Sequence, residues 1–473
     1  MGNRPRTASI HVLDDDSLLH VFYLCRPFLE DENNVADWRH NGRWWYVHVH
    51  VCRRWRNIVL SSANYLGLSL LCTYGTPVAD MLAHSPPLPL VVGYFRKDCE
   101  LTTEDKEGII LALKQHDRVR RVRINSLVTN IEKLFVVMDE EYPILEHLHI
   151  SPRTEDTSSI LTIPETLQAP RLRQLTLRSF ALPIRSRLLT TAVGLVTLHL
   201  VMVHPSTYFH PNTLLQWILL MPQLEMLDIF FKFSIPNHDV ERQLTHTPII
   251  AAPIMLPNLH HFHFRGVSTY LEALAHRITA PHLEKLNIDF FNQLTFAIPR
   301  LLQFMDTSDN LRFGSANFTF SAKKVGMGVY PPGETNLHAL SLVVKCCHLD
   351  WQVSSLAQIS NSLSQIFSAV EHLTLYHKAR SDSSEEHNYV DRIDWRKLLR
   401  PFSNVKTLRI RNGLATGNDL SRCLESEDGE LPLALLPELQ ELIYIGSGNT
   451  RDTITSFIDA RRNAGRPVTL VRQ

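Results

Sequence analysis

The sequence predicts an α/β protein in which a short helical segment precedes an irregular solenoid of strand–helix units. Three observations lead to this prediction. The chain has 473 residues, which is too long for one ordinary compact core. Apolar residues separated by three and then two positions recur from about residue 119 to residue 444. Prolines hold a fixed place relative to this pattern. We therefore expect parallel strands on a concave side and helices on a convex side.

The composition favours a protein partner over nucleic acid or lipid. Lys and Arg together number 48, as do Asp and Glu, so the formal net charge is zero and gives no global attraction to anions. No apolar run approaches the roughly 20 residues that a membrane helix needs. Residues 1–9 lack the apolar stretch of a secretory signal. We expect a cytoplasmic or nuclear protein with no nucleic-acid or membrane partner.

Catalytic and metal-binding patterns are missing from the sequence. The seven cysteines are scattered and include no CxxC pair, which is typical of reduced cysteines rather than of a zinc site. No GxSxG, GxxxxGK[ST], GxGxxG or HExxH motif occurs. The 24 histidines include His260, His261 and His263, which we interpret as surface residues because no carboxylate shell accompanies them. We expect no enzyme activity, metal or cofactor.

Two helices are expected near the N-terminus. Three aspartates at 14–16 precede the apolar residues of a short amphipathic helix at 13–24, where carboxylates suit the positive end of the helix dipole. A polar stretch at about 26–43 follows. Apolar residues then recur at helical spacing over 47–59, although the alternation over 47–51 is also compatible with a strand.

Parts of these two helices resemble the F-box motif. The segments are residues 13–22, LDDDSLLHVF, and residues 51–56, VCRRWR. Residues 44–46, 65–68 and 75–82 add a resemblance to the large F-box family of mushroom-forming fungi. Asp14 replaces the proline of the generic motif, and about ten extra residues separate the helices, but the fungal family resembles this chain in both respects.

The resemblance implies an F-box region at 1–72, with an inserted loop at about 26–43, that docks the adaptor subunit of an SCF-type cullin-RING E3 ubiquitin ligase. The alternative is an amphipathic helical cap on the solenoid, in which Trp55 packs inward as large aromatic residues usually do. The residues implied in adaptor binding are Leu13, Leu18, Phe22, Val51, Cys52 and Trp55.

Residues 73–117 are expected to form a linker and a first capping unit, and 118–473 a solenoid of about 11–12 units. Most units are about 23 to 35 residues long, but the gap of about 54 after Leu283 is expected to hide a degenerate copy around 318–320. Helical patterns lie between the strands at 126–138, 213–220, 268–277, 354–367 and 453–462. The units begin at Val119, Leu145, Leu172, Leu195, Leu224, Leu259, Leu283, Leu337, Val370, Val405 and Leu439.

Proline placement supports these units independently. A proline ends the preceding helix and suits the first residue of a strand, where no ladder donor is needed. Six prolines each stand two residues before the first apolar position of a unit: Pro143, Pro170, Pro222, Pro257, Pro281 and Pro437.

The units resemble leucine-rich repeats, the usual substrate-binding companion of an F-box. The asparagine or cysteine expected three positions after each strand is absent, so we expect an irregular horseshoe without an asparagine ladder. The alternative is a compact α/β domain whose buried parallel strands share the same apolar signature. The positions that depart from the repeat are Arg153, Phe180, Val203, Lys232 and Val267.

Substrate binding is expected on the concave face, where the residues between the apolar positions must point. Arginine and aromatic residues carry a large share of interface energy. Ordinary solvated strand residues are the alternative interpretation, and the arginines at 118, 120, 121 and 123 are a second candidate that could hold an acidic or phosphorylated peptide. The predicted substrate contacts are Arg178, Phe230, Arg265, Tyr376 and Arg411.

Together these features predict a substrate-recognition subunit of an SCF-type ubiquitin ligase, with the F-box bound to the adaptor and the repeats bound to an unknown target protein. Such a subunit would act by proximity and would not itself transfer ubiquitin. The alternative function is a repeat-based interaction scaffold that acts outside ubiquitylation.

Overall fold

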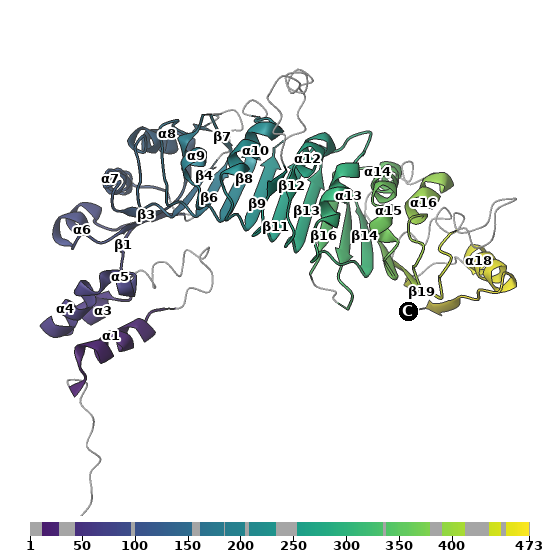
Figure 1. Ribbon diagram of the computed structural model, residues 1–473, viewed down its shortest axis with the longest axis horizontal. Helices are drawn as coiled ribbons and strands as arrows, with labels where there is room; N and C mark the ends of the chain where they lie inside the picture. Colours follow the sequence, from purple (N-terminus) through teal and green to yellow (C-terminus); the bar gives the residue numbers. More distant parts are fainter. Residues whose placement is uncertain are drawn as a thin grey trace, which may run out of the picture. The chain divides into compact units, whose positions relative to one another are not determined.

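The computed structural model describes residues 12–27, 43–95, 100–153, 161–183, 185–203, 208–232, 253–333, 337–378, 390–411, 435–445 and 451–472. The chain forms two compact units, residues 1–195 and 196–473, called unit 1 and unit 2 below. The predicted α/β class is confirmed, because the protein contains a large, mostly parallel sheet of 16 strands that alternate with helices (Figure 1).

Unit 1 begins with short helices. The expected first helix is present as α1, and Asp14 caps its start by accepting a 2.7 Å hydrogen bond from the Ser17 N–H. Most of the insert expected at 26–43 lies outside the described residues. The helices are α1 (Asp15–Leu24), α3 (Tyr46–Val49), α4 (Arg53–Ser61) and α5 (Ala63–Leu66).

The prediction of one continuous helix over 47–59 was wrong. Helix α3 ends at Val49 and α4 begins at Arg53, because Cys52 between them is extended, with φ −159°. The Cys52 sulfur accepts a hydrogen bond from the Trp55 N–H at 3.5 Å and so caps the new helix.

Strands of unit 1 begin at Leu70, earlier than the solenoid expected from 118. Strand β1, with the sequence LLCT, is buried on both faces. It therefore lacks the alternation of apolar and polar residues that marked the later strands. The parallel strands, in sheet order, are β1 (Leu70–Thr73), β2 (Leu90–Tyr94), β3 (Val119–Leu127), β4 (His147–Arg153) and β6 (Gln174–Arg178).

The helices of unit 1 occupy the connections between these strands. The expected helix at 126–138 is present, two residues shorter at its start, because β3 extends to Leu127. The helices are α6 (Val78–His84), α7 (Thr103–Leu113), α8 (Val128–Val137) and α9 (Arg187–Thr191), and the short β5 (Leu161–Thr162) pairs with β7 (Phe180–Ala181).

Unit 2 continues the strand–helix alternation, with its helices on one side of its strands (Figure 1). Its strands, in sheet order, are β8 (Thr197–Val203), β9 (Met226–Phe231), β11 (His261–Gly266), β13 (Lys285–Phe290), β16 (Leu340–Val344), β15 (Lys324–Tyr330), β14 (Ser315–Ser321), β17 (His372–His377), β18 (Thr407–Arg411), β19 (Glu441–Ile445) and β20 (Thr469–Arg472). The short β10 (Ile254–Met255) pairs with β12 (Ile278–Thr279).

The four helices expected within unit 2 are all present, the third of them split in two. The described helices are α10 (Pro211–Leu219), α12 (Ser268–Ala275), α13 (Pro299–Asp306), α14 (Leu349–Ser362), α15 (Ser364–Phe367), α16 (Arg392–Leu399) and α18 (Arg451–Asn463).

The prolines lie in a turn that recurs before the strands. Around Pro281, the Leu283 N–H donates to the Ala280 carbonyl at 3.2 Å, which closes a turn with proline at its second position. The next two N–H groups, of Glu284 and Lys285, both donate to the carbonyl of His260, the residue just before β11, at 2.9 and 3.0 Å. Equivalent bonds recur at other strands, so the turn fixes the register of each strand against its predecessor.

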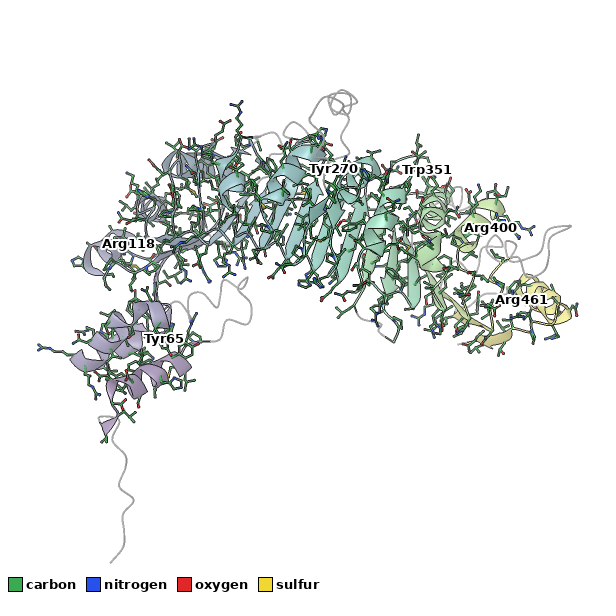
Figure 2. All side chains as sticks on the ribbon, in the orientation of Figure 1. Tyr65, Arg118, Tyr270, Trp351, Arg400 and Arg461 are labelled. Atoms are coloured by element: carbon green, nitrogen blue, oxygen red, sulfur yellow. The ribbon has the colours of Figure 1, made fainter. Side chains whose placement is uncertain are left out.

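Alternate strand residues of unit 2 point toward its helices and form the core. Phe262 of β11 meets Phe304 of α13 with ring centroids 6.1 Å apart, and Phe320 of β14 meets Trp395 of α16 at 5.5 Å. Side chains fill the space between strands and helices (Figure 2). We call the opposite side of these strands the open face. Its residues include His199, Val201, Asp228, Phe230, His263, Arg265, Asn287, Asp289, Ser315, Asn317, Thr319, Ser341, Val343, His372, Thr374, Tyr376, Thr407, Arg409 and Arg411.

A hairpin interrupts the parallel order of unit 2. A strand does cover 318–320, as expected, but it is not a simple further unit. Strand β15 follows β14 after two residues, 322 and 323, and such a short connection requires antiparallel pairing. Strand β15 also pairs antiparallel with β16, so two strands, β16 and β15, lie between β13 and β14 in the sheet.

Candidate functional site

The N-terminal helices of unit 1 pack around two of the residues implied in adaptor binding. Leu18 and Phe22 of α1 are fully buried. The Phe22 ring lies 5.1 Å from His48 and 4.9 Å from Trp55, centroid to centroid. Trp55 is half-buried, in an edge contact with Phe22, so much of it serves the packing of this helical cluster. Leu18 and Phe22 can therefore support a docking surface but do not form it.

Other residues of the predicted docking set lie at the surface of this cluster. Leu13 is 38% exposed and Val51 is 56% exposed, while Cys52 is half-buried. Arg54 of α4 joins the two segments, because its guanidinium donates to the Leu13 carbonyl at 2.6 Å and pairs with Asp15 at 2.7 Å. Arg54, three residues after Val51, thus holds the start of α1 against the start of α4.

In the middle of unit 2 the open face is internally paired. His199 of β8 lies 2.6 Å from the Asp228 carboxylate, and Arg265 donates to the Asp289 carboxylate from Nε at 2.9 Å and from Nη2 at 2.5 Å. Phe230 contacts the His263 ring at 4.3 Å and lies under the Arg265 guanidinium at 5.2 Å. The structure therefore brings two predicted substrate contacts, Phe230 and Arg265, together, but Asp289 already binds the arginine.

Burial shapes the electrostatics of this paired region. Burial lowers the pKa of His263, and the nearby Asp228 and Asp289 carboxylates oppose that shift without reversing it. His263 is therefore neutral near pH 7 and adds no positive charge between the two carboxylates.

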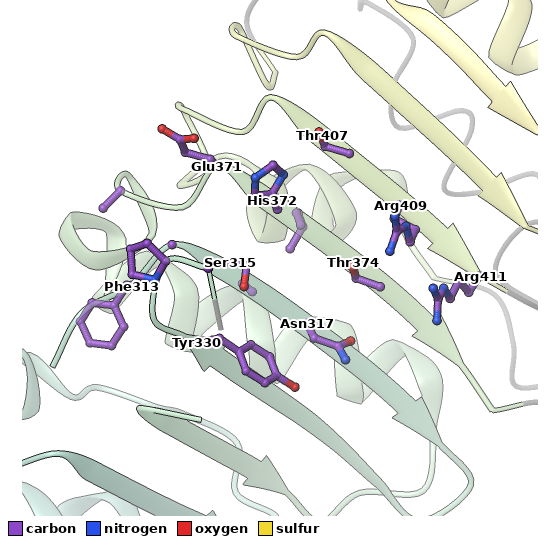
Figure 3. Close-up of a pocket in the computed structure, with 16 residues that line it drawn as sticks. Phe313, Ser315, Asn317, Tyr330, Glu371, His372, Thr374, Thr407, Arg409 and Arg411 are labelled. Carbon is purple, nitrogen blue, oxygen red and sulfur yellow. The ribbon is translucent and has the colours of Figure 1, made fainter. Parts of the chain in front are cut away.

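A pocket of about 760 Å³ opens on the same face farther along unit 2 (Figure 3). Its floor comes from β14, β17 and β18, whose residues lie side by side in register: Asn317 opposite Thr374, and Thr374 opposite Arg409. Pro332 and Gly333 contribute from the turn after β15. The remaining polar and charged lining residues are Ser315, Tyr330, Glu371, His372, Thr407 and Arg411.

Two polar atoms in this pocket lack partners among the residues that the structure describes. They are Nε of Arg409 and Oδ1 of Asn317, and both atoms are buried. A buried polar atom without a partner is unusual in a folded protein. Arg411, one of the predicted substrate contacts, joins Arg409 on the same side of β18 (Figure 3).

The other predicted contacts are placed as follows. Tyr376 lies opposite Arg411 in the strand register, next to the pocket. Arg178 is exposed at the end of β6 and belongs to unit 1. The substrate contacts predicted from the sequence did not include Arg409 and Asn317, which line the pocket, although the period of two along a strand places Arg409 and Arg411 on one face.

The arginine-rich stretch of unit 1 is largely engaged within the fold. Arg118 donates to the Leu88 carbonyl at 3.1 Å, and Arg120 pairs with Glu146 at 2.8 Å. Arg123 is buried, with its guanidinium 4.0 Å from the centre of the Phe95 ring. These contacts favour a structural role for the cluster over peptide binding.

Metal-ligand clusters and membrane spans were also sought. No group of three or more His, Cys, Asp or Glu side chains suited to a metal occurs within the described ranges. No helix in those ranges is long and apolar enough to cross a membrane. Burial raises the pKa of the Cys72 and Cys346 thiols to about 12, so both stay protonated. Cys99 and Cys423 lie outside the described residues.

No protein-family model matches the chain, and no curated protein matches it significantly.

Proposed function

We propose that the chain is the substrate-recognition subunit of an SCF-type cullin-RING E3 ubiquitin ligase. In this proposal the N-terminal helices bind the adaptor subunit, and the open face of unit 2 binds the target protein. The chain would bring the target close to the transfer machinery held by other subunits. The resemblance to the F-box family rests on residues 13–22 and 51–56, and residues 44–46, 65–68 and 75–82 add the resemblance to the family of mushroom-forming fungi.

The observation that carries the proposal is the packing of these helices. Phe22 and Leu18 fill the interior of the cluster, while Leu13 and Val51, from the same F-box-like segments, stay exposed. Arg54 fixes the two segments against each other. Exposed apolar side chains held on a rigid support favour a docking surface for another protein.

The test is co-purification of the full chain with the adaptor subunit of an SCF ligase. Val51→Asp should weaken the complex by about ten-fold or more, because it would place a carboxylate against an apolar partner. Val136→Asp is the matched control, since Val136 on α8 is also an exposed valine, 81% accessible, outside the F-box-like segments. Leu18 and Phe22 are unsuitable positions because their replacement would disrupt the core of the cluster.

The ligase proposal is wrong if the unaltered chain fails to bind the adaptor, or if both valine variants bind it equally well. Either result would favour the alternative, an interaction scaffold that acts outside ubiquitylation.

A further inference from the structure

The pocket on the open face of unit 2 has the size and lining of a ligand site. Its volume of about 760 Å³ falls within the roughly 300–1,000 Å³ typical of such sites. Three neighbouring parallel strands supply its floor, which is therefore a rigid support. Gly314 makes the rim possible, because a Cβ at this position would lie 2.8 Å from the Cα of Pro332.

The pocket carries an excess of positive charge. Arg409 and Arg411 both contribute to its lining from β18. The carboxylate that lines it, Glu371, is bound by Lys406 at 2.8 Å, and this hydrogen bond lowers the pKa of Glu371. Because Lys406 neutralises Glu371, the two arginines decide the sign of the charge that the pocket attracts.

Two residues that line the pocket also carry buried polar atoms without partners in the described fold. Nε of Arg409 is a buried donor, and Oδ1 of Asn317 is a buried acceptor, and neither has a partner within the described ranges. Thr374 lies between these two residues in register and also lines the pocket. Arg409 is therefore not held through Nε by a neighbouring carboxylate, as Arg265 is held by Asp289.

We propose that this pocket binds an anionic side chain of a protein target, with Arg409 and Arg411 binding its oxygens. Guanidinium groups suit the paired oxygens of a carboxylate or a phosphate. A peptide fits better than an isolated ion because the pocket opens onto a strand face that continues through Tyr376. The inference rests on the proposed function only in taking a target protein as the occupant.

The experiment measures binding of short fluorescent peptides to the full chain. Three peptides differ only in their central residue, which is glutamate, phosphoserine or glutamine. We expect the glutamine peptide to bind at least about ten-fold more weakly than one of the anionic peptides, since it cannot form the charge-assisted bonds. Comparison of the glutamate and phosphoserine peptides shows which source of negative charge the pocket prefers.

Two double variants locate the binding. Arg409→Gln with Arg411→Gln should reduce binding of the preferred anionic peptide by about ten-fold or more. Arg171→Gln with Arg173→Gln removes the same charge from exposed positions of unit 1 and should leave binding unchanged. Equal binding of all three peptides, absence of binding, or equal losses in both double variants would overturn the proposal. Adaptor binding is not required, so failure of the ligase proposal would be seen separately.

Discussion

Two parts of the open face of unit 2 differ in whether their polar side chains have partners within the protein. Across β8, β9, β11 and β13 the strands follow one another in order, and their charged residues are paired within the protein, as in His199 with Asp228 and Arg265 with Asp289. Across β14, β17 and β18, beside the antiparallel β15, Arg409 and Asn317 keep buried atoms that lack partners in the described part of the chain.

This difference shows which arginines are available for a partner. A guanidinium that already binds a carboxylate would have to give up that bond before binding another protein, whereas an unpaired one gains a bond. Arg265 belongs to the first kind and Arg409 to the second. The region beside the hairpin is therefore the better candidate for recognition, and the regular region is the better candidate for support.

The largest expected effect is on stability, and it tests whether the core beneath the two regions is equally well packed. Phe262 of β11 and Phe318 of β14 are both buried, and each meets a phenylalanine on the helix side, Phe304 or Phe402. Replacing either one by alanine should lower the free energy of unfolding by about 3–5 kcal/mol, from lost burial and the remaining cavity. Denaturant titration measures both. A much smaller loss for Phe318→Ala would mean that the hairpin region is loosely packed.

The residues that point toward the helices could be predicted from the sequence because their apolar spacing repeats. Apolar spacing and the prolines predicted most of the parallel strands from β3 to β19, although not β15 or β20. The turn around Pro281 shows the physical reason, because it fixes each strand against the one before. The hairpin could not be predicted in this way, since β14 alternates as the parallel strands do and Val325, Met327 and Val329 of β15 are apolar at the same spacing of two. Only the two-residue connection distinguishes them.

The prediction of binding residues was less successful, because it depends on how side chains pair across neighbouring strands. Alternation predicts which face a residue occupies, but pairing depends on the neighbouring strand, which the register alone decides. Arg265 and Arg411 look equivalent in the sequence. In the structure Arg265 lies opposite Asp289, whereas Arg411 lies opposite Tyr376 and lines the pocket. The sequence also could not show that Arg409 has no carboxylate partner for its Nε within the described residues.

An intermediate effect separates paired from unpaired arginines directly. Asp289→Asn should lower the free energy of unfolding by about 1 kcal/mol, a modest value because both partners are partly exposed to solvent. Arg409→Gln should change it by no more than about 0.5 kcal/mol, since no bond to the described residues through its Nε is lost. Denaturant titration of both variants makes the comparison. If Arg409→Gln costs as much as Asp289→Asn, the guanidinium is engaged within the fold and the contrast between the regions disappears.

The smallest expected effect concerns pH, and it compares one histidine from each region. Burial lowers the pKa of His263 against the opposing effect of Asp228 and Asp289, with Arg265 and His199 also nearby, whereas burial alone lowers the pKa of His377 at the end of β17. In both cases the unfolded chain, with a histidine pKa near 6.5, binds the proton more readily than the folded chain. Stability should therefore be full above about pH 6.5 and fall as the pH drops through the folded pKa.

Melting temperatures recorded between about pH 7.5 and pH 5 should decline less steeply for His263→Gln and for His377→Gln than for the unaltered chain. An unchanged slope in His263→Gln alone would mean that the two carboxylates cancel the effect of burial, and the paired region would then differ from the hairpin region in pH response as well.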